Sequence, residues 1–418
     1  MNNHENEVAL SCISCRQDYH IDEVRYKCDC GGLIEIRHNI SKLKKISTRL
    51  FDDRLSSLKT IDRSGVWRFR EALTGAGEND IVTHPEGATR LYHRSRLSDF
   101  AGVDEIHFKH EGENPTGSFK DRGMSAAVTQ AKILGKKLLA CASTGNTSAS
   151  LAAYAAGAGL EAIVFLPNGK VALGKVAQAI GYGARCLGIR GDFDDAMRMV
   201  NEAKDKFGIY MVNSLNPFRL EGQKTIMWEM LQDLGWNTPD WVVVPGGNLG
   251  NTSAFGKALI EAYNAGWIKR LPRIATIQAS GANPFYQSFA DGFKKPYNVK
   301  AETIATAIRI GNPVNFDKAR RVITELGGVV SEVADSEILE AKSAIDRVGI
   351  GCEPASACSL AGARKLRAQG VIRKSDRVVC ILTGHILKDP DTILSTSTNE
   401  IREIDATMDA VGDFLGKI

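Results

Sequence analysis

Short apolar runs alternate with longer mixed segments along most of the chain after about residue 40. The runs mostly end at Gly, Pro, Ser or Thr, as buried strands do. We expect strands in KLLACAST (137–144), EAIVFLP (161–167), WVVVPGG (241–247), RIATIQAS (273–280) and RVVCILTG (377–384).

The segments between these runs have the length and composition of helices. Examples are SFKDRGMSAAVTQAKILG (118–135), TSASLAAYAAGAG (147–159) and NTSAFGKALIEAYNAG (251–266). Apolar strands that alternate with helices favour an α/β fold in which helices cover both faces of parallel sheets. The chain length favours two large domains.

Composition excludes several classes of protein. The 418 residues are 43% hydrophobic and 24% charged, and 53 Lys and Arg nearly balance 49 Asp and Glu. This balance, without a long basic run, gives no reason to expect nucleic acid or an acidic membrane surface. The N-terminus lacks the features of a signal peptide, and the longest uncharged run (141–160) is too polar to span a membrane. Five of the nine cysteines are scattered along the chain, which is typical of proteins whose thiols stay reduced. We expect a soluble, cytoplasmic protein.

The other four cysteines form a cluster in residues 1–38, which we expect to be a separate small unit. Cys12 and Cys15 make one close pair, and Cys28 and Cys30 another. Two close pairs are typical of a zinc ribbon, because tetrahedral zinc needs four thiolates from two tight turns. One residue separates Cys28 from Cys30, whereas two residues usually separate the cysteines of each pair in a zinc ribbon. A small β-hairpin unit with free cysteines is the alternative, and the sequence leaves both open.

Glycine-rich and polar sequences follow several expected strands, where ligands bind in parallel sheets. The segment Gly246–Asn251 leads from a strand into a helix. Converging backbone N–H groups and a helix N-terminus favour an anion such as phosphate. The segment matches neither the dinucleotide motif nor a Walker A loop. A simple turn is the alternative.

A second polar loop contains Ser143, Thr144, Asn146 and Thr147 before a helix of small residues. Hydroxyls and amides at a helix N-terminus suit a carboxylate or a phenolic oxygen. Helix capping by Thr147 or Ser148 would also explain the hydroxyls, but it explains Asn146 less well.

Lys120 follows the turn in ENPTGSFKDRG (113–123) and would lie in the first turn of a helix. A helix N-terminus repels a charged amine and lowers its pKa. A neutral amine is what Schiff-base chemistry requires. An ordinary solvated lysine remains the alternative when this position is taken alone.

A reactive lysine, a polar loop with an asparagine, and a phosphate-binding glycine loop are the parts that hold pyridoxal phosphate. The chain resembles the threonine synthase family, pyridoxal-phosphate enzymes of fold type II, from about residue 89 to 394. The resemblance lies in NPTGSFKDRG, STGNTSAS, PNGKVALGKVAQAIGYGA, VNSLNPFRLEGQKT, PGGNLGN, ETIATAIRIGNP, EPASACSLAG and LTGHILKDPD.

The resemblance implies a role for each matching residue. Lys120 would join the cofactor covalently and move protons, Phe119 would pack beside the ring, and Asn146 would bind its phenolic oxygen. Thr383 would face the pyridine nitrogen. The cofactor phosphate would lie on the residues of the glycine loop, which are Gly246, Gly247, Asn248, Leu249, Gly250 and Asn251.

The implied reaction turns O-phospho-L-homoserine and water into L-threonine and phosphate by γ-elimination and β-addition, a carbon–oxygen lyase reaction. Ser214 and Arg219, joined by Thr147 and Asn251, would bind the substrate phosphate. Ser143 and Thr144 would bind the α-carboxylate. A surface arginine paired with Glu221 is the alternative for Arg219. The resemblance also implies a homodimer. It implies a large cofactor-binding domain formed by residues 39–125 and 225–418, and a small domain, residues 126–224, that closes on substrate. A cysteate synthase, a threonine or serine dehydratase, and a non-catalytic binding protein are the rival functions.

Overall fold

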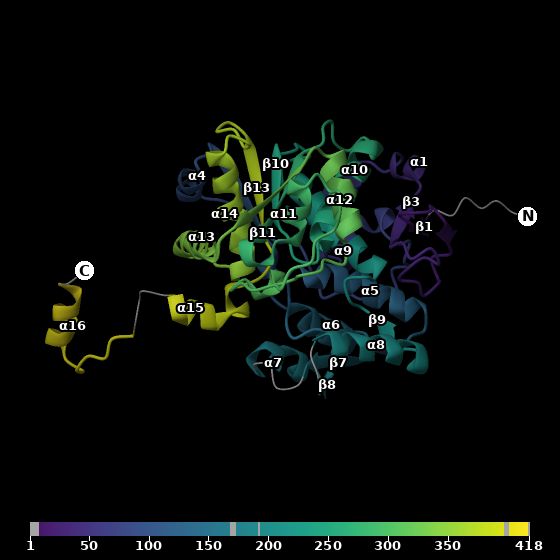
Figure 1. The fold of residues 1–418 in the computed structure, drawn as a ribbon, viewed down its shortest axis with the longest axis horizontal. Coiled ribbons are helices and arrows are strands. Elements are labelled where there is room, and N and C mark those ends of the chain that lie inside the picture. Colours follow the sequence, from purple (N-terminus) through teal and green to yellow (C-terminus); the bar gives the residue numbers. More distant parts are fainter. Residues whose placement is uncertain (1–7, 168–172, 191–192, 397–400, 417–418) are drawn as a thin grey trace, which may run out of the picture.

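The computed structural model describes residues 8–167, 173–190, 193–396 and 401–416. Three sheets organise these residues (Figure 1). The segment PNGKVALGKVAQAIGYGA, which contributes to the resemblance, lies partly outside the described residues.

The largest sheet has six strands in the order β12-β11-β10-β13-β5-β4. All neighbouring pairs are parallel except β4 and β5, which are antiparallel. Its central strands are buried apolar runs, as a sheet covered on both faces requires. The strands are β4 (Leu91–His93), β5 (Glu105–His110), β10 (Trp241–Pro245), β11 (Arg273–Ala279), β12 (Val329–Val333) and β13 (Arg377–Leu382).

A second parallel sheet has four strands in the order β8-β7-β6-β9. These strands are β6 (Leu138–Ala142), β7 (Glu161–Pro167), β8 (Arg185–Ile189) and β9 (Tyr210–Met211). The five strands expected from sequence are therefore present as β6, β7, β10, β11 and β13. The exact domain limits stay a prediction, since one helix runs through residues 224 and 225.

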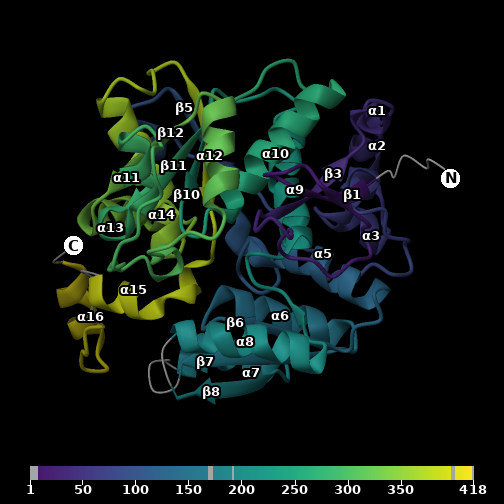
Figure 2. The same cartoon turned by 45° about the vertical axis from the view of Figure 1, so that its right-hand side comes forward.

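Residues near the N-terminus form a small antiparallel sheet in the order β2-β1-β3. Its strands are β1 (Val8–Cys12), β2 (Asp18–Tyr19) and β3 (Ile34–His38). In Figure 2 this sheet lies beside α9 and α10, on the side of the molecule away from β12.

Helices cover the faces of both parallel sheets (Figure 2). The longer ones are α5 (Lys120–Ile133), α6 (Asn146–Gly157), α8 (Phe193–Phe207), α9 (Pro217–Asp233), α10 (Gly250–Ala265), α12 (Phe316–Glu325), α13 (Asp335–Arg347) and α14 (Pro354–Ala368). The shorter ones are α1 (Ile40–Leu43), α2 (Thr48–Asp53), α3 (Thr60–Arg63), α4 (Ser95–Ala101), α7 (Leu173–Gly181), α11 (Pro284–Ala290), α15 (Pro390–Thr396) and α16 (Met408–Leu415).

Helix α9 lies at the centre of the molecule. Almost every residue of α9 is buried, including charged ones, because it packs between α5 and α10. Pro217 at its first turn and Asn216, whose side chain accepts the N–H of Phe218 at 3.0 Å, fix where it starts. Helix α9 is therefore held between α5 and α10, with β3 also in contact with it.

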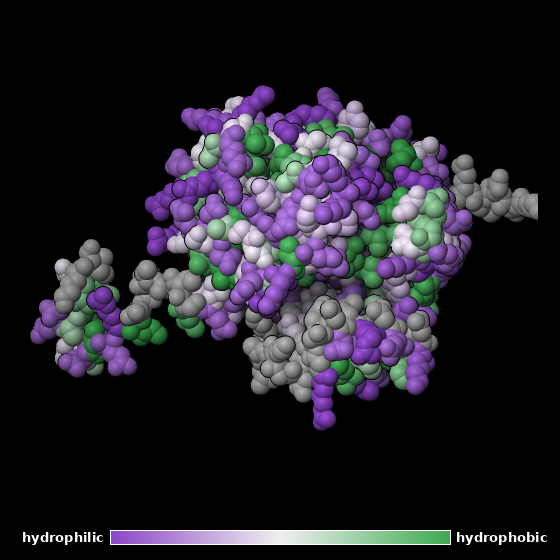
Figure 3. All heavy atoms as spheres, in the orientation of Figure 1, coloured by the Kyte–Doolittle hydropathy of each residue, from purple (hydrophilic) through white to green (hydrophobic). Residues whose placement is uncertain are grey.

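The molecular surface on the face in Figure 3 is mostly hydrophilic, and apolar side chains occur as scattered patches. Among the helices that the structure describes, none combines the length and apolar composition that a membrane crossing requires.

Candidate active site

Two loops distant in sequence hold Lys120 in place. The N–H of Phe119 donates to the carbonyl of Thr383 at 3.0 Å, and the N–H of His385 donates to Gly117 at 2.9 Å. The turn before α5 is thus joined to the loop that follows β13. As a result, Lys120 begins α5 at the carboxyl edge of the large sheet, next to Thr383.

The environment of Lys120 favours a neutral amine. The side chain is half-buried, and its Nζ lies 3.7 Å from the centre of the Phe119 ring. Burial, helped by the positive charge of Arg219, lowers the pKa of Lys120 to about 7, although Glu353 opposes the shift. This confirms the expected direction, with burial as the main cause. A solvated lysine is not what the structure contains.

Glu353 joins two of the expected cofactor residues. Asn146 Nδ2 donates to Glu353 Oε2 at 3.0 Å, and Thr383 Oγ1 donates to Glu353 Oε1 at 2.9 Å. Glu353 is buried immediately before α14, and burial raises its pKa while the two hydrogen bonds oppose that shift. Ser356 lies 2.9 Å from the Thr383 hydroxyl. Side chains from two distant segments, Asn146 and Thr383, therefore meet on the carboxyl group of Glu353.

Arg219 lies in the first turn of α9 and is only 2% exposed. Its Nη1 donates to the carbonyl of Val212 at 2.9 Å, and its Nε has no partner among the described residues. Burial lowers its pKa to about 10. The surface pairing with Glu221 is wrong, because Glu221 contacts His38, Lys224 and Lys257 instead. A buried guanidinium with an unused donor is suited to an anion.

The glycine loop lies between β10 and α10. A Cβ on Gly246 would lie 2.6 Å from Thr276 Cγ2, and one on Gly247 would lie 3.1 Å from Ile308 Cα. Leu249 has a positive φ of 61°, which closes the turn into the helix. The N–H of Gly246 donates to Ile277 at 2.7 Å. The N–H groups that follow it, up to the first turn of α10, have no intrahelical acceptor and suit an anion.

Segment 314–315 joins the glycine loop to the expected substrate site. The N–H of Val314 donates to Asn248 Oδ1, and Asn315 Nδ2 donates to the carbonyls of Ser214 and Asn248, each at 3.3 Å. The side-chain oxygen of Asn251 is buried and has no partner among the described residues. The loop therefore contains a buried hydrogen-bond acceptor that is not paired with any described residue.

The second polar loop lies between β6 and α6, where Ser143, Thr144 and Thr147 are half-buried. No side-chain cap holds the start of α6, so the capping alternative is wrong. Ser148 Oγ donates instead to the carbonyl of Gly145 at 2.7 Å. The hydroxyls of this loop lie beside Asn146 at the carboxyl edge of the smaller sheet.

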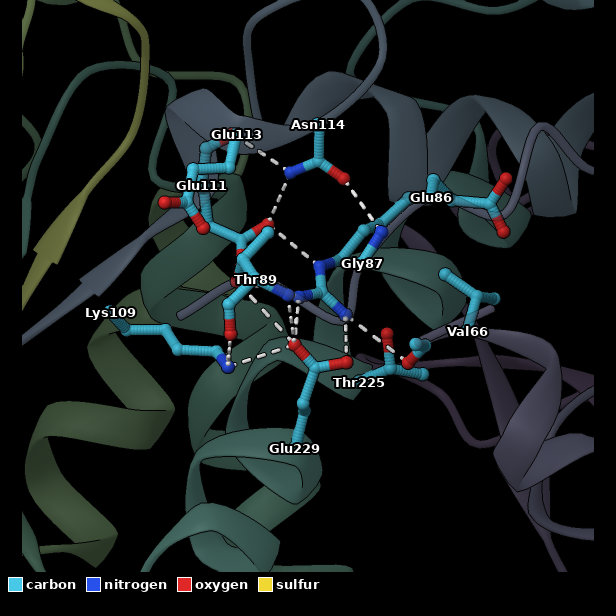
Figure 4. A network of polar contacts seen from close by, with 12 residues as sticks. Val66, Glu86, Gly87, Thr89, Lys109, Glu111, Glu113, Asn114, Thr225 and Glu229 are labelled. Atoms are coloured by element: carbon cyan, nitrogen blue, oxygen red, sulfur yellow. Dashed lines mark hydrogen bonds and ion pairs between the residues drawn. The ribbon is translucent and has the colours of Figure 1, made fainter. Parts of the chain in front are cut away.

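A buried ionic network surrounds Arg122 of α5, and Figure 4 shows its members Lys109, Glu111, Asn114 and Glu229. Arg122, two residues after Lys120 on α5, contacts Glu229 of α9 and Glu111, each at 2.7 Å. Lys109 of β5 reaches Glu229 at 2.8 Å. Asn114 donates to Glu111 at 2.8 Å. The network fixes α5 against α9 and the large sheet, and so fixes the helix that carries Lys120.

Sequence reasoning missed two side chains. The sequence indicated for Glu353 only a structural role or a place beside the cofactor ring, without a catalytic one, although a lone carboxylate directly before Pro354 could have marked a helix start at a site. Gln223 gave no signal: its Oε1 is buried without a partner among the described residues, 3.6 Å from where a Cβ on Gly250 would lie. Only the crossing of α9 and α10 brings it there.

Comparison with known proteins agrees with this geometry. The family model described as "Pyridoxal-phosphate dependent enzyme" matches residues 82–384. The chain belongs to this family of pyridoxal-phosphate dependent enzymes.

Individual relatives narrow the assignment. Threonine synthase of Methanocaldococcus jannaschii is 50% identical over 396 residues, covering 94% of this chain and 95% of the relative. That of Methanosarcina acetivorans is 47% identical over 405 residues, covering 96% and 97%. The solved threonine synthase of Escherichia coli shares the fold, with a TM-score of 0.71 over 98% of this chain and 99% of that one, at 16% identity. Within the family, the chain is a member of the threonine synthases.

The residues present fit pyridoxal phosphate. The glycine loop leaves room only for backbone at Gly246, the amine of Lys120 has a lowered pKa, and Asn146 and Thr383 meet at one place. These are an anion cradle, a nucleophilic amine and two polar groups, which is the donor set that such a cofactor needs.

Proposed function

We propose that this enzyme converts O-phospho-L-homoserine and water into L-threonine and phosphate. The observation that carries the proposal is the pair Lys120 and Arg219: a half-buried amine with its pKa near 7 beside a buried guanidinium with a free Nε. An amino acid that bears a phosphate needs both groups. The relatives named threonine synthase support the same activity.

Binding of the cofactor is divided among four parts of the chain. Lys120 would anchor it covalently, Phe119 would pack beside its ring, and the backbone of residues 246–251 would hold its phosphate. Asn146 and Thr383 orient the ring, supported by Glu353 at 3.0 and 2.9 Å. When bound, pyridoxal phosphate withdraws electrons from the α-carbon of the amino acid joined to it, which acidifies the proton there.

Two separate anion sites orient the substrate. Arg219 and Ser214, with Thr147 and Asn251, bind the substrate phosphate, and Ser143 and Thr144 bind the α-carboxylate. Charge-assisted hydrogen bonds of this kind fix both ends of the molecule. The neutral amine of Lys120 takes the α-proton and returns protons later, because its lowered pKa lets it exchange them near pH 7.

The assembly and domain roles complete the proposal. Residues 39–125 and 225–418 bind the cofactor, and residues 126–224 close on the substrate. The scattered cysteines support a cytoplasmic enzyme, and similarity to its family supports a homodimer. Light scattering coupled to gel filtration tests the dimer: a single species of twice the mass of 45.4 kDa is expected, and a monomer overturns this part.

A two-substrate assay tests the activity. The holoenzyme is incubated with phosphohomoserine, and separately with phosphoserine and sulfite. Threonine and phosphate are expected in the first reaction alone. Cysteate in the second would identify a cysteate synthase, and conversion of threonine or serine to an oxo acid would identify a dehydratase.

A further inference from the structure

The sulfur atoms of the four N-terminal cysteines lie together at one end of the small antiparallel sheet. The Sγ atoms of Cys12, Cys15, Cys28 and Cys30 all lie within 4.8 Å of one another. Cys12 and Cys30 are 3.6 Å apart, and Cys15 and Cys28 are 3.5 Å apart. With Zn–S bonds of about 2.3 Å, tetrahedral geometry places two sulfurs about 3.8 Å apart. A disulfide needs about 2.05 Å. The spacing therefore fits one shared ion.

Two tight turns bring the sulfurs together. In the first, the N–H of Arg16 donates to the carbonyl of Cys12 at 3.1 Å, and Arg16 has a positive φ of 65°. In the second, the N–H of Gly31 donates to Cys28 at 2.8 Å, with a φ of 84°. A Cβ on Gly32 would lie 2.6 Å from the sulfur of Cys12. The backbone is thus shaped around the sulfur atoms.

Hydrogen-bond donors face two of the sulfurs. The N–H of Ser14 donates to Cys12 Sγ at 3.4 Å, and the hydroxyl of Tyr19 lies 2.9 Å from Cys28 Sγ. Donors directed at a thiolate stabilise its negative charge and support it as a metal ligand.

We propose that Cys12, Cys15, Cys28 and Cys30 bind one Zn²⁺ in a closed structural site. Four thiolates satisfy the tetrahedral preference of zinc and leave no position for substrate, so the ion takes no part in the reaction. On binding, the thiols release their protons to solvent. Cys12 and Cys28 are buried while Cys15 and Cys30 are exposed, so the ion lies at the edge of the unit, within reach of chelators.

The proposed ion would hold the sheet in the shape that contacts the enzyme body. The carbonyl of Ile34 accepts from Lys318 of α12 at 2.7 Å, and Glu35 accepts from Arg321 at 3.0 Å. His38 lies 2.7 Å from Glu221 of α9. All three residues are on β3, which pairs with β1 up to Cys12. Loss of zinc would therefore loosen this unit first and leave the parallel sheets intact.

Metal analysis of the purified full-length enzyme, produced in medium containing both zinc and iron, tests the proposal. About one zinc per chain is expected, and none in the double variant Cys15→Ser/Cys28→Ser. Cys186→Ser, which changes a half-buried cysteine on β8, is the matched control and keeps its zinc. Less than about half an equivalent in the parent enzyme, zinc retained by the double variant, or iron in place of zinc overturns the proposal.

A second measurement covers the case in which the double variant misfolds. In the parent enzyme, a thiol reagent should react slowly with Cys15 and Cys30 until a chelator removes the metal, although both are exposed. Cobalt exchanged into the parent should give the visible bands of a tetrahedral thiolate complex. Immediate reaction of both thiols without chelator, or a colourless cobalt form, contradicts a bound ion.

Discussion

Asn146 and Glu353 are hydrogen-bonded across 207 positions of sequence, with Asn146 Nδ2 3.0 Å from Glu353 Oε2. Glu353 accepts from Thr383 with its other oxygen. A single buried carboxylate thus aligns the two polar groups on which the cofactor ring is proposed to lie.

Replacing this carboxylate by an amide should weaken cofactor binding. An amide has one acceptor oxygen, so Glu353→Gln directs its NH₂ at one of the two donors. Loss of a hydrogen bond to a charged group costs about 1.5–3 kcal/mol, or about 10–100-fold in the dissociation constant of pyridoxal phosphate. Absorbance titration of the apoenzyme measures this constant. The Glu340→Gln variant, which changes an exposed glutamate, serves as the control. Equal dissociation constants for the parent enzyme and both variants would contradict this role of Glu353.

Lys120→Ala should abolish both covalent cofactor attachment and threonine formation. The holoenzyme should absorb near about 410–420 nm, where a protonated Schiff base absorbs, and the variant should lack this band. Lys132→Ala, which removes a lysine from the other end of α5, should keep the band and the activity. Turnover by Lys120→Ala at the parent rate would falsify the assignment.

Attachment of pyridoxal phosphate to the apoenzyme should depend on pH around the pKa of Lys120. Since burial lowers this pKa from 10.5 to about 7, the neutral amine increases as the pH rises through 7 and is nearly complete above about 8. The attachment rate should rise and then level off. Removing the charge of Arg219 with Arg219→Met should move the profile to higher pH. A rate still climbing toward pH 10 would indicate an ordinary lysine.

Arg219→Ala should raise the KM for phosphohomoserine more than it lowers kcat. The missing charge-assisted bonds correspond to about 1.5–3 kcal/mol, or about 10–100-fold. Arg219→Lys keeps the charge in this buried position and should recover part of the loss. Arg320→Ala, on an exposed face of α12, is the control. Steady-state kinetics with unchanged KM in Arg219→Ala would place the substrate phosphate elsewhere.

Arg122→Leu should destabilise the protein strongly, because it leaves Glu111 and Glu229 buried with fewer partners. Breaking a buried ion pair from one side costs about 3–5 kcal/mol of unfolding free energy. Urea unfolding followed by circular dichroism measures this. Arg364→Ala removes the exposed pair with Glu340 and should cost about 1 kcal/mol or less. Similar losses in both variants would show that the network adds no special stability.

Much of the site could be predicted from local sequence. The glycine loop and the loop before Asn146 each follow an apolar run and open a helix, and the turn before Lys120 opens a helix after Pro115 and Gly117. Such signals depend on neighbouring residues alone. Parallel pairing then places the carboxyl ends of β10 and β13 on one edge. This is why local sequence is enough to predict that these loops lie near one another.

Tertiary structure decided which polar side chains have partners. Glu221 lies two residues from Arg219, but α9 turns it toward His38 and Lys257 and leaves Arg219 buried with a free Nε. Glu353 reaches Asn146 and Thr383 only because α14 begins beside the end of β13. The sequence determined the strands, the helices and the reactive loops, since these follow from local propensity and periodicity. Burial and partner choice depend on contacts between distant segments, and only the folded chain fixes them.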